Sequence, residues 1–208
     1  MHNPFRFPAR CHVRGPDPGP FADYQKYRTH LRREFRRKCV YCRTPDTLGS
    51  AVYEIDHYLP KKQFPELIAA WSNLFYGCRN CNRRKHNFSP RPDLFIPNPC
   101  DHQMADHLQF RGARIETYTP CGAFMVELLR LDEEERQNYR DFVIREIHEK
   151  LEQWRDLRAE LEQLGDRLRG APSAKERAEL EKEIAEILGD LRYIANALEI
   201  LTGEPWTT

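Results

Sequence analysis

The sequence predicts an α+β protein: a small unit of two short strands and a helix, followed by a mainly α-helical region that ends in a long antiparallel helical hairpin. Two Cys-x-x-Cys pairs that bracket two short apolar segments indicate the first part. Apolar residues at spacings of three and four along two stretches of the last third indicate the second. A proline-rich stretch lies between them. The chain is therefore expected to divide into segments 1–20, 21–100, 101–131 and 132–208.

Composition narrows the class of protein. At 208 residues with 40% hydrophobic content, the chain can bury a sizeable core. It contains no run of about 18 apolar residues and no apolar signal core after Met1, so the sequence predicts a cytoplasmic protein without a membrane span.

Residues 1–100 carry 18 Lys and Arg against 8 Asp and Glu, whereas residues 101–208 carry 15 against 24. The first half therefore suits a polyanion, and the second suits solvent or another protein.

The N-terminal segment is expected to be irregular, because residues 1–20 contain five prolines and two glycines. Residues 21–38 follow a helical pattern. Tyr24, Tyr27, Leu31 and Phe35 form one apolar stripe, and basic residues fill much of the remaining surface. A solvated helix and a phosphate-contacting helix both fit this pattern.

The central segment has the order strand, loop, strand, helix. Residues 51–55 (Ala-Val-Tyr-Glu-Ile) predict the first strand, and Pro65 can open a short helix that runs through Ala70. Residues 74–76 (Leu-Phe-Tyr) predict the second strand, and residues 81–88 predict a basic helix that ends before the next proline. This order is a ββα unit.

The rest of the chain is expected to be a connection followed by the hairpin. Residues 89–122 are rich in turn formers and predict a connecting region with one β-hairpin. His102 and His107 are expected to be surface or hydrogen-bonding residues rather than metal ligands. Helical periodicity is evident over 147–168 and 180–198, on either side of Gly170-Ala171-Pro172 and a capping box from Ser173 to Glu176. So short a break predicts that the helices fold back antiparallel.

Four cysteines have the spacing of a zinc site. Cys39 with Cys42 and Cys78 with Cys81 can each aim two sulfurs at one point, and 35 residues separate the pairs. Four thiolates at this spacing predict one tetrahedral structural Zn²⁺. The odd total of seven cysteines argues against a disulfide framework. The other three are expected to be small buried hydrophobes: Cys11, Cys100 and Cys121.

A second group of polar residues suits a catalytic cation. Asp56 and His57 follow the first predicted strand, so Asp56 can bind a cation while His57 faces a water that attacks phosphorus. Asn82 and His86 lie four apart and share a helical face. Asp56 and Asn82, with or without His86, can converge on one divalent cation such as Mg²⁺ or Mn²⁺, which would stabilise the developing negative charge.

Three motifs carry a resemblance to a known family. They are Tyr53-Glu-Ile-Asp56-His57-Tyr-Leu-Pro60-Lys61, Trp71-Ser-Asn73-Leu74 and Cys78-x-x-Cys81-Asn82-x-x-Lys85-His86. Over 39–87 the chain resembles the HNH endonucleases of the ββα-metal (His-Me finger) superfamily, a treble-clef-like fold. The resemblance implies that Asp56 is a metal ligand, His57 the general base and Asn73 a brace for the loop that carries His57. The family often has His at the position of Asn82, and His86 corresponds to an extra ligand in some members. Asn82, His86 or both therefore complete the site.

A looser resemblance extends beyond this segment. Residues 98–101 (Asn-Pro-Cys-Asp), the turn-rich segment after them and the helical tail resemble the small HNH subunits of Septu and retron-type antiphage systems. In those systems an HNH protein works beside an ABC-type ATPase. The resemblance implies a bacterial defence nuclease whose partner, such an ATPase or another defence-system protein, binds through the C-terminal helices.

DNA is the expected substrate, bound through its phosphates without base reading. Seven residues are expected to contact the phosphates: Arg36, Arg37, Lys38, Arg79, Arg83, Arg84 and Lys85. Two alternatives stay open: a non-catalytic zinc module that binds nucleic acid, and an interaction protein that works through its acidic hairpin.

Overall fold

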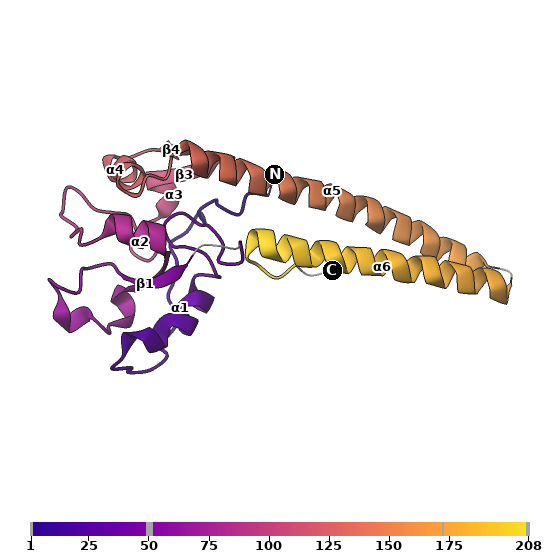
Figure 1. The fold of residues 1–208 in the computed structure, drawn as a ribbon, viewed down its shortest axis with the longest axis horizontal. Coiled ribbons are helices and arrows are strands. Elements are labelled where there is room, and N and C mark those ends of the chain that lie inside the picture. Colours follow the sequence, from indigo (N-terminus) through magenta and orange to yellow (C-terminus); the bar gives the residue numbers. More distant parts are fainter. Residues whose placement is uncertain (1, 49–51, 172, 207–208) are drawn as a thin grey trace.

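The molecule has a globular end, from which a long helical hairpin projects (Figure 1). This computed structural model describes residues 2–48, 52–171 and 173–206. Its helices α5 (Glu134–Gly170) and α6 (Ala174–Thr202) form the hairpin, and nearly all the other elements lie in the globular end. The predicted class, a small sheet unit followed by a long helical region, is confirmed.

The globular end contains the predicted ββα unit. Strands β1 (Tyr53–His57) and β2 (Leu74–Cys78) pair antiparallel, with His57 opposite Leu74, and α2 (Arg79–Lys85) follows β2 directly. Short 3₁₀ helices η2 (Pro65–Leu67) and η3 (Trp71–Asn73) occupy the connecting loop. The first strand therefore reaches His57 rather than ending at Ile55, because pairing with β2 continues to that residue; Ala51 lies outside the described residues.

The predicted helix over 21–38 is shorter in the structure. It consists of η1 (Tyr24–Tyr27) and α1 (Arg28–Glu34), and the apolar stripe faces the core as expected. The helix ends because Arg36 and Arg37 adopt left-handed backbone angles (φ 52° and 59°) that turn the chain toward Cys39. The turn thus delivers the first cysteine pair to β2.

The segment expected to be a connection is part of the core. It contains α3 (Met104–His107), the predicted hairpin of β3 (Leu108–Arg111) and β4 (Arg114–Thr117), and α4 (Pro120–Leu129). His107 hydrogen-bonds Thr119 and His102 accepts from the Asn98 N–H, as predicted. Met104, Leu108, Phe110, Met125 and Leu129 are buried in one apolar cluster with residues of β1, β2 and α1.

The N-terminal residues are irregular, as predicted, but they do not form a free arm. Phe5 and Phe7 are buried in the main core, and Phe7 exchanges backbone hydrogen bonds with the Gln109 side chain. The Arg14 guanidinium lies 4.5 Å from the Phe75 ring centroid and 5.2 Å from that of Trp71. This segment therefore ties the β3–β4 hairpin to the ββα unit.

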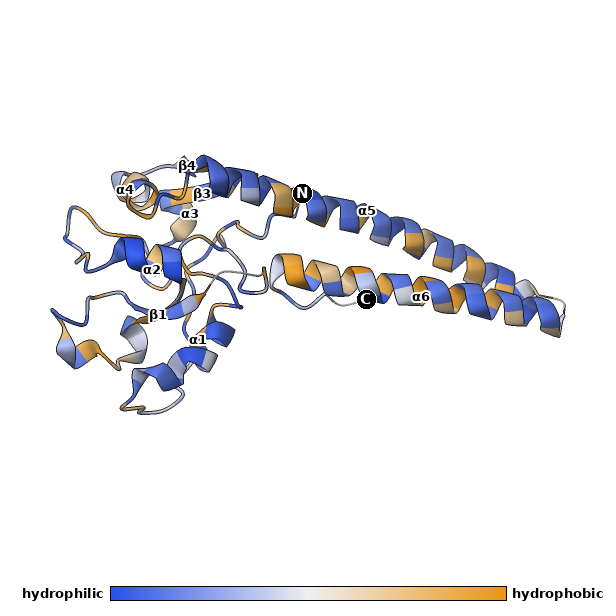
Figure 2. Cartoon of the chain, in the orientation of Figure 1, coloured by the Kyte–Doolittle hydropathy of each residue, from blue (hydrophilic) through white to orange (hydrophobic). Residues whose placement is uncertain are grey.

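The hairpin is stabilised by its own apolar seam. The start of α5 and the end of α6 attach it to the globular end. Leu164, Leu180, Ile187 and Leu191 form the distal seam. Figure 2 shows hydrophobic bands that alternate with hydrophilic ones along α5 and α6. The Ser173 hydroxyl accepts from the Glu176 N–H, as the capping box predicts; Pro172 lies outside the described residues. Within the described chain, no helix combines the length and apolarity needed to cross a membrane.

The end of α6 returns to the segment around the first cysteine pair. Gly203, at the C-cap of α6, has φ 74° and so close an approach that an added Cβ would lie 2.9 Å from Pro45. Arg37 pairs with Glu199 (3.0 Å) and Lys38 with Glu204 (2.7 Å). The hairpin base is thereby fixed against the cysteine-bearing loop.

Candidate functional site

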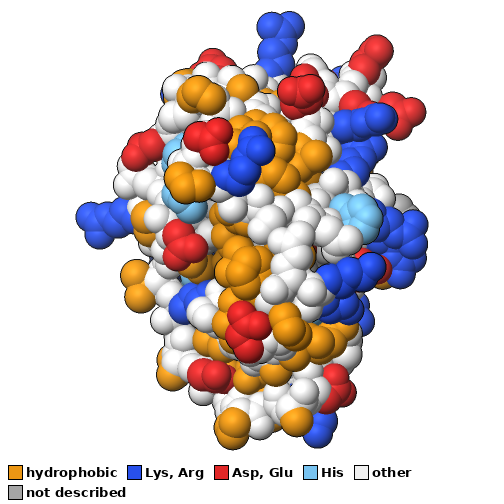
Figure 3. Space-filling model, turned by 90° about the vertical axis from the view of Figure 1, so that its left-hand side faces the viewer, with side chains coloured by type: hydrophobic (Ala, Val, Ile, Leu, Met, Phe, Trp, Pro, Cys, Tyr) orange, Lys and Arg blue, Asp and Glu red, His pale blue; other side chains and the backbone are white. Residues whose placement is uncertain are grey.

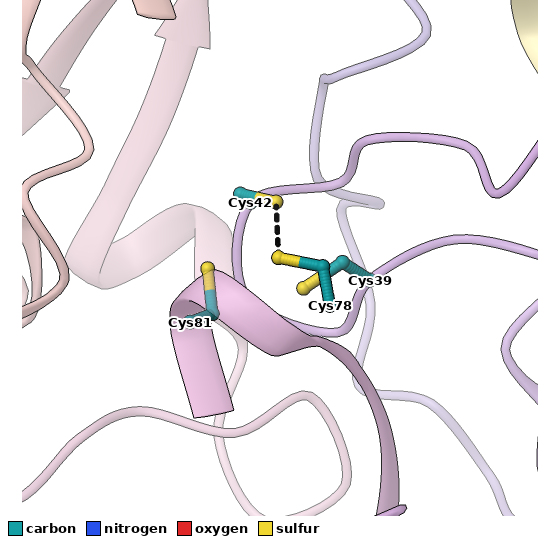
Figure 4. Close-up of side chains that lie close together, drawn as sticks. All are labelled: Cys39, Cys42, Cys78 and Cys81. Carbon is teal, nitrogen blue, oxygen red and sulfur yellow. Dashed lines mark hydrogen bonds between the residues drawn. The ribbon is translucent and has the colours of Figure 1, made fainter. Parts of the chain in front are cut away.

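The four paired cysteines converge as predicted. Cys39, Cys42, Cys78 and Cys81 are buried, and their sulfur atoms all lie within 4.8 Å of one another (Figure 4). Tetrahedral zinc with Zn–S bonds of about 2.3 Å separates its sulfurs by about 3.8 Å, and the Cys42 and Cys78 sulfurs are 3.8 Å apart. The cluster therefore has the ligands and spacing of a structural zinc centre.

The three remaining cysteines lie outside this cluster and differ in burial. Cys121 is buried and Cys100 half-buried, but Cys11 is exposed, so the prediction of a buried hydrophobe is wrong for Cys11.

Arg136 of α5 donates from Nη1 to Cys81 Sγ at 3.9 Å. The hairpin thus supplies a positive charge to the outer side of a thiolate cluster, whose charge it partly balances.

A cavity of about 620 Å³ opens beside His57. Its lining comes from η1 and α1, from β1 and the loop after it, and from α2 with the residues that follow. Asp56, His57, Asn82 and His86 all line it. The structure therefore brings the four residues of the predicted cation and base group to one space, although they come from two separate segments of the chain.

The Asp56 carboxylate is held by the protein itself. Tyr41 donates its hydroxyl to Oδ2 (2.5 Å), and Lys85 Nζ lies 3.1 Å from Oδ1 and 2.7 Å from the His57 carbonyl oxygen. The Asp56 and Lys85 side chains are 2% and 1% exposed. Burial and the Asp56 charge raise the pKa of Tyr41 well above its usual value, so Tyr41 remains a donor. Asp56 is therefore a buried, paired carboxylate among the residues that line the cavity.

His57 is half-buried at the end of β1. Its Nε2 lies 2.9 Å from the Ile68 carbonyl oxygen, and the Tyr24 ring packs edge-on at 4.7 Å between centroids. Because a carbonyl can only accept, Nε2 carries the proton and Nδ1 keeps a lone pair. Burial lowers the pKa of His57 below its usual value of 6.5. A neutral imidazole with a free Nδ1 is the form that a general base requires.

Asn73 lies under the loop that follows His57. Its Oδ1 accepts from the Leu59 N–H (2.8 Å), and its Nδ2 donates to the carbonyls of Leu59 (3.1 Å) and Leu67 (3.3 Å). These bonds join Asn73, at the end of η3, to the start of the loop at Leu59 and to η2 at Leu67. The contacts are those that a loop brace would make, and the role itself stays a prediction.

Asn82 meets a carboxylate that the sequence did not single out. Its Nδ2 donates to Glu54 Oε2 (2.9 Å), while Glu54 Oε1 accepts from Arg79 Nε (2.6 Å). His86, at the C-cap of α2, is exposed and adopts φ 48°. Among the described residues, the cysteine cluster is the one group of three or more His, Cys, Asp or Glu side chains arranged to hold a metal. The ligand roles of Asp56, Asn82 and His86 therefore stay predictions.

Two of the seven predicted phosphate contacts are corrected by the structure. Lys38 and Lys85 are 3% and 1% exposed and are paired with carboxylates, so neither can reach a phosphate. Arg84 donates to the Leu129 carbonyl and pairs with Glu133, which fixes α2 to the start of α5. Arg37 and Arg79 are half-buried in ion pairs with Glu199 and Glu54. Arg36 and Arg83 are exposed and have no ion pair within the described chain.

The structure adds two cations that sequence clustering missed. Arg28 and Lys61 line the cavity together with Arg83, and none of these three has an acidic partner among residues 2–48, 52–171 and 173–206. They come from α1, the loop after β1 and α2, so no local run of charge identifies them. On the end of the molecule away from the hairpin, Lys and Arg side chains gather along one edge beside a histidine (Figure 3).

Comparisons with known proteins agree with this geometry. Residues 39–88 match the family model described as HNH endonuclease. The chain is similar to the Septu protein PtuB of Bacillus thuringiensis, with 29% identity over 102 residues that cover 49% of this chain and 39% of that protein. The chain thus spans well under half the length of this relative. No solved structure is significantly similar to the chain. Residues 39–88 therefore match an HNH domain, in a chain that is similar to a Septu protein.

Proposed function

We propose that this chain is a metal-dependent endonuclease that hydrolyses phosphodiester bonds in DNA. The observation that carries the proposal is the cavity beside His57. The His57 imidazole lines it together with the Glu54 and Asp56 carboxylates and the Asn82 amide. Arg28, Lys61 and Arg83 also line it, and they have no acidic partners in the described chain. A cavity lined by unpaired cationic side chains favours an anionic ligand. A phosphodiester carries that negative charge, and its phosphorus is the atom that a water can attack.

His57 acts as the general base of the reaction. Nδ1 takes a proton from the attacking water, whose oxygen bonds to phosphorus as the bond to the leaving oxygen breaks. The hydrogen bond from Nε2 to the Ile68 carbonyl keeps the ring oriented and stabilises it once it is protonated. Asp56, Asn82 and His86 would hold a Mg²⁺ or Mn²⁺ ion, which supplies electrostatic stabilisation of the developing charge when bound. Asn73 holds the loop at the position that this geometry needs.

One observation favours a second candidate, a zinc module that binds nucleic acid without cutting it. Both Asp56 oxygens already accept hydrogen bonds, from Tyr41 and Lys85. A cation must therefore use the remaining lone pairs of this carboxylate or displace Lys85. The same cavity without a bound divalent cation would hold phosphate and not hydrolyse it.

A cleavage assay separates the two functions. The intact chain is incubated with duplex DNA, single-stranded DNA or RNA in Mg²⁺ or Mn²⁺, beside His57→Ala and the control His30→Ala, a half-buried histidine that stacks on Phe21 outside the cavity. We expect His57→Ala to lose at least about 100-fold in cleavage rate while it retains zinc and DNA binding. Cleavage that persists in His57→Ala removes the proposed base. DNA binding without any cleavage by the unaltered chain supports the zinc module.

We propose further that the nuclease serves bacterial antiphage defence in the cytoplasm, beside an ABC-type ATPase or another defence-system protein docked on α5 and α6. Residues Phe142, Tyr193 and Ile200 on these helices are large, apolar and exposed. Deleting α6 would remove Ile194 and Leu198 from the main core, so point changes are the better test. Phe142→Ser with Tyr193→Ser is expected to abolish co-purification with the partner and to leave intrinsic cleavage intact. Undiminished co-purification would contradict docking at these residues.

A further inference from the structure

Glu54 occupies a position next to the proposed cation site. It lies two residues before Asp56, so both side chains point from the same face of β1. That face meets α2, where Asn82 and Lys85 lie three apart on one helical face. Two parallel contacts result: Glu54 with Asn82, and Asp56 with Lys85.

The Glu54 carboxylate is ionised and can only accept hydrogen bonds. Its Oε1 accepts from Arg79 Nε at 2.6 Å, and a carboxyl group paired with a guanidinium is held in its charged form. An ionised carboxylate has no proton to donate. The Asn82 amide must therefore turn its NH₂ group toward Glu54, and the chemistry of the pair fixes the amide orientation.

This orientation determines which atom Asn82 offers to the cavity. With Nδ2 held by Glu54, Oδ1 is left on the other side of the amide, and it receives no hydrogen bond from any described residue. Asn82 lines the same cavity as Asp56 and His57. An amide oxygen is a ligand for Mg²⁺ or Mn²⁺, whereas an amide NH₂ would point its hydrogens at the ion and repel it.

We propose that Glu54 is a positioning residue for the catalytic cation: it holds the Asn82 amide so that the oxygen, and not the NH₂ group, faces the ion. The inference rests on the proposed function, because it requires a cation at Asn82. Glu54 acts through Asn82, and Arg79 holds the second Glu54 oxygen in place at 2.6 Å. Partners of metal ligands that act in this way commonly contribute about 10- to 100-fold in metal affinity.

A double-mutant cycle tests the proposal. Mn²⁺ affinity of the full chain with its zinc retained is measured calorimetrically for the unaltered protein, Glu54→Ala, Asn82→Asp and the double variant. We expect Glu54→Ala to weaken Mn²⁺ binding about 10- to 100-fold. The carboxylate introduced by Asn82→Asp offers an oxygen in either orientation. In that background, Glu54→Ala should change the affinity by no more than about twofold.

Two further variants make the cycle interpretable. Glu54→Gln keeps an acceptor oxygen for Asn82 and should lose less affinity than Glu54→Ala. The control Glu116→Ala removes an exposed glutamate of β4 that pairs with Arg111, away from the cavity, and should leave Mn²⁺ affinity unchanged. Zinc content and thermal unfolding are measured for each variant, so that a loss of fold is recognised.

The outcomes separate this inference from the function on which it rests. Equal losses from Glu54→Ala in the unaltered protein and in the Asn82→Asp background would make Glu54 a direct ligand and overturn the positioning role. Unchanged affinity in Glu54→Ala would overturn it as well. An unaltered protein that retains zinc and binds no Mn²⁺ overturns the cation site of the proposed function, and the inference falls with it.

Discussion

The cysteine centre and the cavity beside His57 are both built on the ββα unit, yet they satisfy their polar groups differently. The four cysteine sulfurs face one another, and few other groups contact them. The oxygens of Asp56 and the amide nitrogen of Asn82 are bonded to Tyr41, Lys85 and Glu54. A site whose ligands face only one another needs its ion in order to fold, whereas a site whose charges are paired by the protein can stand without one. We infer that zinc in the cysteine cluster is permanent and that the cation proposed beside His57 is exchangeable.

Replacing a zinc ligand should have the largest effect. Cys39→Ser is expected to lower the free energy of unfolding by on the order of 5 kcal/mol, because zinc binding by such a site is coupled to folding. Zinc content by elemental analysis and urea unfolding measure the change. Cys11→Ser, at an exposed cysteine, is the matched control and should change neither quantity. A zinc-free Cys39→Ser protein of unaltered stability would contradict the comparison.

Breaking the ion pair below the cavity should come next. Lys85→Met leaves Asp56 buried without its cation and is expected to destabilise the fold by about 3–5 kcal/mol. Lys38→Met is the matched control: Lys38 is also buried, but its partner Glu204 is 39% exposed and regains water. Urea unfolding should therefore show a clearly smaller loss for Lys38→Met. Similar losses in the two variants would mean that Asp56 is hydrated once Lys85 is removed.

The pH dependence of cleavage tests the protonation state of His57. Burial lowers the pKa of His57 below 6.5, so the base stays neutral at pH 6.5 and protonates only in more acidic solution. The cleavage rate should therefore hold to a pH below 6.5 and then fall about tenfold per pH unit. Tyr24→Ala exposes the ring that Tyr24 covers and should move the acid limb upward, toward 6.5. An acid limb above pH 6.5 in the unaltered protein would argue against the neutral base.

The smallest effects are expected at the cavity rim. Lys61→Ala and Arg83→Ala should each reduce the slope of log affinity for DNA against log salt concentration by about 0.9, since each would remove one phosphate contact. Arg84→Ala should leave the slope unchanged, because Arg84 is bound to the Leu129 carbonyl and Glu133. Binding titrations over a range of salt concentrations measure the slope. A reduced slope in Arg84→Ala would show that this ion pair opens on DNA.

Sequence patterns predict the presence of the helices more accurately than the residues at which they begin and end. The helix predicted over 81–88 begins earlier, at Arg79, and ends at Lys85, since His86 adopts φ 48°. The helix predicted over 21–38 ends at Glu34 because Arg36 and Arg37 turn left-handed to bring Cys39 to β2. Both endings are set by what the chain must reach next, which periodicity does not record.

Basic residues show the same limit for the site. A run such as Arg83-Arg84-Lys85 looks uniform in sequence, but its members face the cavity, α5 and the buried Asp56 in turn. Successive positions on a helix point about 100° apart, so neighbours in sequence meet different surroundings. Arg28 and Lys61 are far apart in the sequence and come together only at the cavity, so no local cluster of basic residues identifies them.

The sequence by itself determined the cysteine ligands, the order of the ββα unit and the antiparallel hairpin, because fixed spacings and periodicities encode them locally. Tertiary structure alone decided that Lys85 and Lys38 are buried, that Phe5 and Phe7 belong to the core, and that Glu54 meets Asn82. Burial and pairing depend on which surfaces pack together, and those surfaces come from segments far apart in the chain. Local pattern therefore identifies the groups that carry chemistry, and packing assigns each its partner.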